Sequence, residues 1–139
     1  MMKIKNRKRA YSKNVSINTT VLNFKEKDLC KQFYLRVRML QIHNQFPFEF
    51  FIFHVANEQN TNKGYTMLLM SMGLRPGVLD YCILLPQGRV AFIEFKRNTK
   101  CKPTEKQKEF IGTCGRLSIP TIVTCDVDEA VEWIMRLGV

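Results

Sequence analysis

The stretch VLDYCILLPQGRVAFIEFK, residues 78–96, decides the fold of this chain. Two apolar runs, 78–85 and 89–96, flank Pro-Gln-Gly at 86–88. Strand-like runs separated by a few turn residues are typical of a β-hairpin. The sequence therefore predicts a hairpin near the middle of the chain.

The second strand of this hairpin has two unlike faces. Because side chains alternate along a strand, odd residues from Ala91 to Phe95 share one face and even residues from Val90 to Lys96 share the other. The odd face is apolar throughout, whereas the even face ends in Glu94 and Lys96. This pattern indicates a strand that leaves the core at the rim of a cleft.

The length of the turn determines which residue faces Glu94. If Pro-Gln-Gly forms a three-residue turn, Asp80 lies directly opposite Glu94, with Cβ atoms about 4.5–5.5 Å apart. A two-residue turn would shift the register by one residue and move Asp80 to the other face. Facing carboxylates repel each other and raise the pKa of one of them. The three-residue turn thus predicts an acid pair that needs a counter-charge.

A divalent cation would offset the repulsion between Asp80 and Glu94. Carboxylate oxygens suit Mg²⁺, and a bound metal can lower the pKa of water and polarise a phosphoryl oxygen. Lys96, on the same face, would stabilise charge that develops on a phosphate or position the attacking water. The alternative is an ordinary Glu–Lys arrangement on a solvated face.

Basic residues crowd directly behind this strand, namely Arg97, Lys100, Lys102, Lys106 and Lys108. The 139-residue chain carries a net charge of +10, and such a surplus indicates a polyanionic partner, usually nucleic acid. Alone, the basic run would more often be a solvated loop. Beside an acidic metal centre it fits a phosphodiester substrate.

The remaining segments predict one α/β domain. Periodicity and capping signals predict helices from near Asn23, over 61–72, from Thr104 and from Asp126, and further strands over 48–55 and 119–124, the latter buried. The order α-β-α-β-β-α-β-α predicts a mixed sheet of about four strands flanked by helices. Residues 1–20, polar and basic, are expected to form a flexible arm, which leaves 21–139 for the domain.

Two features of these segments have two interpretations each. Gln107 stands three residues after Thr104, so it either completes a capping box or hydrogen-bonds water or phosphate in the cleft. The aromatic run, Phe46, Phe48, Phe50, Phe51 and Phe53, either packs in the core or forms part of an interface.

The cysteine spacing and the lengths of the apolar runs argue against disulfide-bonded, zinc-finger and membrane-spanning proteins. The five cysteines form no C-x-x-C pair, and neither His43 nor His54 stands at a zinc-finger spacing from one, so we expect reduced thiols, a cytoplasmic location and no structural zinc site. No apolar run approaches the roughly 18 residues of a membrane span.

The stretches GLRPGVLDYCILLPQGRVAFIEFKR and PTEKQKEF resemble the VRR-NUC (virus-type replication–repair nuclease) domain of the PD-(D/E)xK nuclease superfamily. The matching pattern is Gly-x-x-Asp before a hairpin, Glu-x-Lys on its second strand and a Gln that opens the next helix, met here by Gly77, Asp80, Glu94, Lys96 and Gln107. The resemblance covers roughly residues 23–135. Leu79 departs from it, because the family usually has Pro before the Asp.

The resemblance implies a restriction-endonuclease-like core and a DNA nuclease that depends on Mg²⁺ or Mn²⁺. It implies that Asp80, Glu94 and the backbone carbonyl of Phe95 hold the metal, and that Lys96 is the catalytic lysine. It also implies a site role for Gln107. Family members often carry an acid on the first helix, where Glu26 is the best match. Its alternative is a capping-box role in its own helix.

Standalone members of this family are small, often viral, and resemble junction-resolving enzymes that act as dimers. The resemblance thus implies a homodimer acting on branched DNA in replication, repair or recombination, in a host cytoplasm if the chain is viral. Arg97, Lys100, Lys102 and Lys106 would hold the backbone without reading bases. The alternative is a non-catalytic DNA-binding module on a nuclease-like scaffold.

Overall fold

The computed structural model describes residues 25–56 and 62–138. In chain order the elements are α2 (Glu26–Ile42), β1 (Phe51–His54), α3 (Lys63–Ser71), β2 (Tyr81–Leu84), the 3₁₀ turn η1 (Pro86–Gly88), β3 (Val90–Phe95), α4 (Glu105–Arg116), β4 (Thr121–Thr124) and α5 (Val127–Leu137). Apart from the short turn, this is the predicted order of helices and strands, and the α/β fold class is confirmed. The predicted arm, residues 1–20, lies outside the described residues.

The four strands form one mixed sheet in the order β1-β2-β3-β4. The β1–β2 and β2–β3 pairs are antiparallel, whereas β4 runs parallel to β3 after the α4 crossover. The prediction that β4 is buried is wrong for most of the strand, because β4 lies at the edge of the sheet. Of its residues only Thr124 is buried, and Val123 is 36% exposed.

The β2–β3 hairpin has the register of the three-residue turn. Tyr81 pairs with Ile93 and Cys82 with Phe92, so the next position places Asp80 opposite Glu94. Left-handed backbone at Gln87 and Gly88 closes the turn, with φ of 64° and 70°. The two ends of β3 are therefore anchored differently, one at a tight turn and the other beside Asp80.

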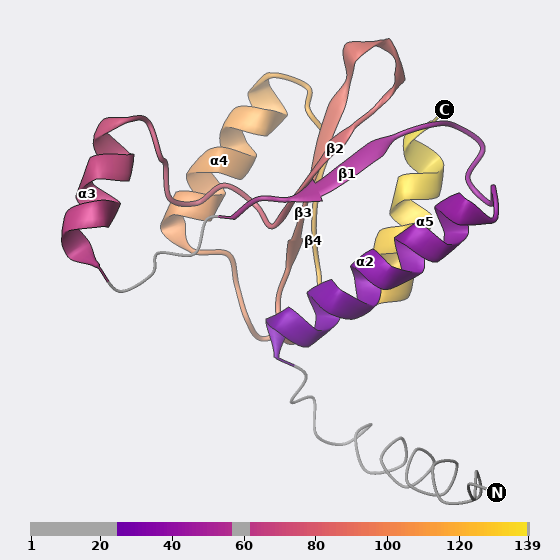
Figure 1. The fold of residues 1–139 in the computed structure, drawn as a ribbon, viewed down its shortest axis with the longest axis horizontal. Coiled ribbons are helices and arrows are strands. Elements are labelled where there is room, and N and C mark those ends of the chain that lie inside the picture. The colour runs from indigo at the N-terminus through magenta and orange to yellow at the C-terminus, as the bar shows by residue number, and fades with distance from the viewer. Residues whose placement is uncertain (1–24, 57–61, 139) are drawn as a thin grey trace, which may run out of the picture.

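The main core lies on the odd face of β3. Ala91, Ile93 and Phe95 are each 0% exposed there, under α2 and α5 (Figure 1). The ring of Phe33, from α2, lies 5.0 Å from that of Phe95. The opposite face of the sheet meets α4, where Phe110 packs edge-on against Phe92. Helices thus cover both faces of β3.

The aromatic run around β1 divides between the core and the surface. Phe50 is buried, and Phe46 and Phe48 pack against the core. Phe51 is 64% exposed and Phe53 is 40% exposed. Core packing therefore accounts for three of the five aromatic rings in this run.

The sequence correctly predicts the N-cap residues of some helices and not of others. Thr104 caps α4 and Asp126 caps α5, as expected. The prediction for Glu26 as a capping-box residue is wrong, because Glu26 is the first residue of α2 and Lys25 is its N-cap. Asn23, the expected cap, lies outside the described residues. None of the helices in the described ranges is long and apolar enough to cross a membrane.

Candidate active site

One pocket of about 370 Å³ lies where β3 leaves the sheet. Its lining includes every side chain that the sequence analysis assigned to catalysis, namely Glu26, Asp80, Glu94, Lys96 and Gln107. They come from four places in the chain: the start of α2, the residue before β2, the end of β3 and the first turn of α4. The fold thus gathers these residues around a single hollow.

Asp80 and Glu94 face each other across the hairpin and exchange contacts. The backbone N–H of Asp80 donates to Glu94 Oε2 at 3.1 Å. The backbone N–H of Phe95 donates to Asp80 Oδ2 at 2.8 Å. Each carboxylate is therefore held by the backbone of the opposite strand. The side chain of Phe95 points into the core, so only its backbone lies at the site.

Glu94 is an acid in an unfavourable place for a negative charge. The residue is 3% exposed. Burial, and then the charge of Asp80, raise the pKa of Glu94 above its ordinary value, while Lys96 opposes the shift. Because the net shift is upward, Lys96 offsets only part of the cost of the buried carboxylate.

Lys96, Glu94 and Gln107 form a closed network. Lys96 Nζ lies 2.9 Å from Glu94 Oε1 and donates to Gln107 Oε1 at 2.8 Å. Gln107 Nε2 donates to Glu94 Oε1 at 2.6 Å. The lysine side chain is 10% exposed. Glu94 and Lys96 therefore do not lie on a solvated face, and the alternative of an ordinary surface pair is wrong.

Gln107 completes the capping box of α4 and also lines the pocket, where it contacts Lys96 and Glu94, whereas its bond to water or phosphate stays a prediction. Its backbone N–H donates to Thr104 Oγ1 at 3.2 Å, and its Oε1 accepts from the backbone N–H of Thr104 at 2.9 Å. These two bonds are the capping box of α4. Because the same Oε1 also accepts from Lys96, the cap of α4 orients the lysine.

Gly77 lets the loop before β2 reach this cap. Its φ is +95°, in the region that favours glycine. A Cβ at this position would lie 2.5 Å from the backbone C and O of Lys106. No other residue type fits without moving α4. The glycine of the Gly-x-x-Asp pattern thus holds Asp80 next to the helix that carries Gln107.

Glu26 reaches the pocket from α2. It is exposed, and no side chain caps the helix that it begins. With three carboxylates on one pocket, Glu26, Asp80 and Glu94, the site offers the hard oxygen ligands that Mg²⁺ and Mn²⁺ prefer. Burial and the charge of Asp80 raise the pKa of Glu94, so an added positive charge would offset the repulsion between the two carboxylates. The residues present therefore fit a divalent cation.

The predicted DNA-binding residues follow β3 in the chain, up to and including the first turn of α4. Arg97, Lys100 and Lys102 are exposed and form no ion pair with any acid in 25–56 or 62–138. Lys106 lines the pocket and lies 3.7 Å from Glu109. The first three cations are therefore available to an external anion, whereas Lys106 is partly neutralised.

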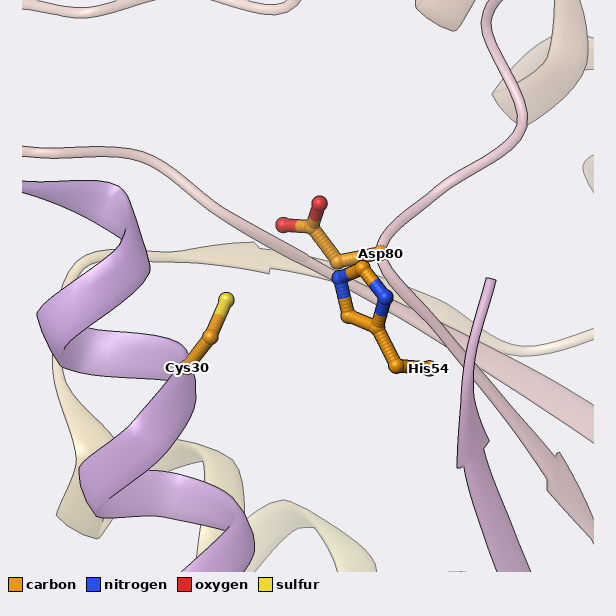
Figure 2. A group of neighbouring side chains, drawn as sticks. All are labelled: Cys30, His54 and Asp80. Carbon is orange, nitrogen blue, oxygen red and sulfur yellow. The ribbon is translucent and has the colours of Figure 1, made fainter. Parts of the chain in front are cut away.

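A second cluster beside the pocket was missed by the sequence analysis. Donor atoms of Cys30, His54 and Asp80 all lie within 4.8 Å of one another (Figure 2). Burial, and then the charge of Asp80, raise the pKa of the Cys30 thiol to about 12. These residues are far apart in the sequence, so no spacing rule could have found them.

A solved structure described as "VRR_NUC domain" is similar to this chain, with a TM-score of 0.51 and 19% identity. The similarity covers 77% of this chain and 94% of that one. No family model matches the sequence, and no curated protein matches it. At this identity the likeness concerns the fold. The described part of the chain therefore has the fold of a VRR-NUC domain.

Proposed function

We propose that this chain is a DNA nuclease that uses a divalent metal ion, Mg²⁺ or Mn²⁺, to hydrolyse phosphodiester bonds. The observation that carries the proposal is the network that the buried Glu94 and Lys96 form with Gln107 beside Asp80. A buried acid facing a second carboxylate, with a buried lysine beside it, is costly to maintain for stability alone, because ions lose their hydration on burial. A catalytic use of these charges explains their position.

Asp80, Glu94 and the backbone carbonyl of Phe95 would hold the metal. When bound, the cation would supply a Lewis acid that polarises the phosphate and lowers the pKa of water. Asp80 and Glu94 are already fixed by opposite-strand N–H groups, so little ordering is needed on binding. Glu26, at the exposed start of α2, would contribute a further oxygen from the other wall of the pocket.

Lys96 would stabilise the negative charge that develops on the phosphate. Its ammonium is held by Glu94 and Gln107, so its donors are oriented before substrate arrives. The surroundings are poorly solvated, and electrostatic interactions are stronger there than in water. Gln107 acts as a positioning residue, because its contact reaches the substrate through Lys96.

The substrate would be DNA recognised through its backbone. The exposed cations Arg97, Lys100 and Lys102 follow β3 in the chain. Contacts of such residues with phosphates position a protein on DNA without reading the base sequence. Branched or junction DNA is our proposed preference. A homodimer, which the resemblance implies, would bring two pockets to the two strands of such a junction. The exposed rings of Phe51 and Phe53 are apolar surface that a second copy would cover.

A panel of labelled linear, flapped and four-way-junction DNA tests the proposal. With Mg²⁺ or Mn²⁺, wild type should cut at least one branched substrate, and chelation should stop the reaction. Asp80→Asn should abolish cutting. Glu105→Gln is the matched control, because Glu105 is exposed and pairs with Lys108 outside the pocket. Salt-sensitive DNA binding without cutting would instead support a non-catalytic binding module.

A further inference from the structure

Three elements bring Cys30, His54 and Asp80 together at the side of the catalytic pocket. Figure 2 shows the Cys30 sulfur, carried by α2, directed toward the His54 ring and the Asp80 carboxylate. The three donor atoms lie within 4.8 Å of one another. Each residue is the type of ligand that proteins use for metals, and the set is mixed: sulfur, nitrogen and oxygen.

The backbone holds these three residues in place. His54 pairs with Tyr81 at the end of the β1–β2 ladder, and the N–H of Val55 donates to the Asp80 carbonyl at 2.7 Å. The Tyr81 hydroxyl donates to the Cys30 carbonyl at 3.0 Å. The strand ends and the helix are therefore tied to each other through Tyr81. The cluster does not depend on a chance approach of mobile side chains.

The chemistry of this set differs from that of the catalytic pocket. Mg²⁺ takes oxygen ligands, whereas a thiolate with an imidazole selects zinc-like cations. Zinc bonds of about 2.0–2.3 Å require donor atoms roughly 3.5 Å apart. A small rotation of the exposed His54 side chain, whose ring packs edge-on against Tyr81, would bring its nitrogen closer to the other two donors. Three protein ligands with one open position is a frequent zinc arrangement.

Asp80 belongs to both sets. The catalytic pocket and a neighbouring pocket of about 640 Å³ share three lining residues, Glu26, His54 and Asp80. Cys30 lines only the neighbouring pocket, whereas Glu94 and Lys96 line only the catalytic one. A cation bound from the Cys30 side would therefore draw on the acid that the catalytic pocket needs.

We propose that Cys30, His54 and Asp80 form a second metal site, selective for zinc-like cations, and that its occupation withdraws Asp80 from catalysis and inhibits cleavage. The inhibitory half of this inference rests on the proposed nuclease function. The binding half does not, because it concerns only the metal and three side chains. The two halves are therefore tested separately.

Cobalt absorption tests the binding half on the full chain under reducing conditions. Co²⁺ reports a thiolate ligand through a sulfur-to-cobalt charge-transfer band. We expect this band in wild type at one equivalent, its loss in Cys30→Ser, and affinity lowered by about tenfold or more in His54→Ala. Zn²⁺ should displace the cobalt and remove the band.

Matched variants separate this site from the other thiols and from the catalytic pocket. Cys125→Ser and His43→Ala change a half-buried cysteine and an exposed histidine elsewhere, and both should keep the band. Glu94→Gln should also keep it, since Glu94 is not a ligand of this site. A wild-type chain without the band, or a band that survives Cys30→Ser in a folded chain, would overturn the proposal. Circular dichroism of Cys30→Ser verifies that it is folded.

Cleavage with excess Mg²⁺ tests the inhibitory half. For each variant, the rate with one equivalent of Zn²⁺ is divided by its own rate without zinc. In wild type the ratio should be about 0.1 or lower, because zinc slows cleavage by about tenfold or more. In Cys30→Ser the ratio should stay near one. Equal inhibition of both would overturn the link through Asp80. If wild type cuts no DNA at all, the nuclease proposal fails, and the cobalt spectra still decide whether the metal site exists.

Discussion

The two faces of the six-residue strand β3 have different roles: one packs in the hydrophobic core, and the other ends at the candidate active site. On the odd face, Ala91, Ile93 and Phe95 are completely buried against apolar neighbours. On the even face, Glu94 is almost as buried, at 3% exposure, but its neighbours are charged or polar. Burial alone therefore does not distinguish a structural position from a chemical one. The partners that each side chain meets make the difference.

This comparison predicts that the two faces fail in different ways. Substitutions on the odd face should lower the free energy of unfolding, because they leave cavities. Substitutions at the charged end of the even face, Glu94 and Lys96, should chiefly remove chemistry, because a buried ion pair adds little net free energy to folding once the lost hydration of both ions is counted. Four substitutions test this difference between the faces.

Phe95→Ala should have the largest effect. The ring is 0% exposed and lies 5.0 Å from the ring of Phe33, so its removal should lower the free energy of unfolding by about 3–5 kcal/mol. Urea unfolding followed by the fluorescence of Trp133, the single tryptophan, measures the change. Val90→Ala, on the other face, should cost about 1 kcal/mol or less. Equal costs would contradict the comparison.

Lys96→Met should have the next largest effect, and this effect should be on the cleavage rate. The variant keeps the length of the side chain but loses the ammonium held by Glu94 and Gln107. We expect the cleavage rate to fall by about 10²–10³-fold. Because the variant leaves the buried Glu94 without its counter-charge, unfolding is measured below the raised pKa of Glu94, where the carboxyl is neutral, and should there change by much less than in Phe95→Ala. Lys96→Arg is the second variant, and it should not restore the rate, since a guanidinium does not replace a positioned ammonium.

Gly77→Ala should lower both the stability of the fold and the cleavage rate. The added Cβ would meet the Lys106 backbone at 2.5 Å and force an L-residue to a φ of +95°. We expect a loss of about 1–3 kcal/mol in unfolding free energy, together with slower cleavage, because α4 carries Gln107. Gly115→Ala is the matched control, since its Cβ would meet no atom within 4 Å. A harmless Gly77→Ala would contradict the role given to this contact.

Asp80→Asn should show the smallest change in stability, with the opposite sign. Without metal, removing the charge facing Glu94 should raise the free energy of unfolding by up to about 1 kcal/mol, because the amide oxygen can still accept from the Phe95 N–H. The folded chain raises the pKa of Glu94, so metal-free stability falls as the pH rises through that pKa. Asp80→Asn should weaken this dependence. Thermal unfolding across pH with a chelator present measures both effects.

The sequence predicted the hairpin well because its determinants are local. Turn length sets the register, and the register together with alternation places Asp80 opposite Glu94. Gln107 was ambiguous, since its capping role is local but its bond to Lys96 crosses the fold. That bond depends on how α4 packs, which the residue pattern does not contain.

What the sequence could not predict depends on contacts between distant segments. The start of α2 at Glu26 differs from the capping-box prediction, and β4 is an edge strand because nothing among the described residues pairs with its outer side. The proximity of Cys30 and His54 to Asp80 requires the packing of α2 against the sheet. The spacing of residues along the chain does not predict this contact.

The most direct test of the central claim is metal-dependent cleavage of junction DNA by Glu94→Gln beside wild type. The substitution keeps the shape of a side chain that is 3% exposed, removes its charge and turns one of its two acceptor oxygens into a donor. We expect Mg²⁺- or Mn²⁺-dependent cutting by wild type and a loss of at least about 10²-fold in the variant, with the fold intact by circular dichroism. Equal cutting by the two proteins would contradict the claim.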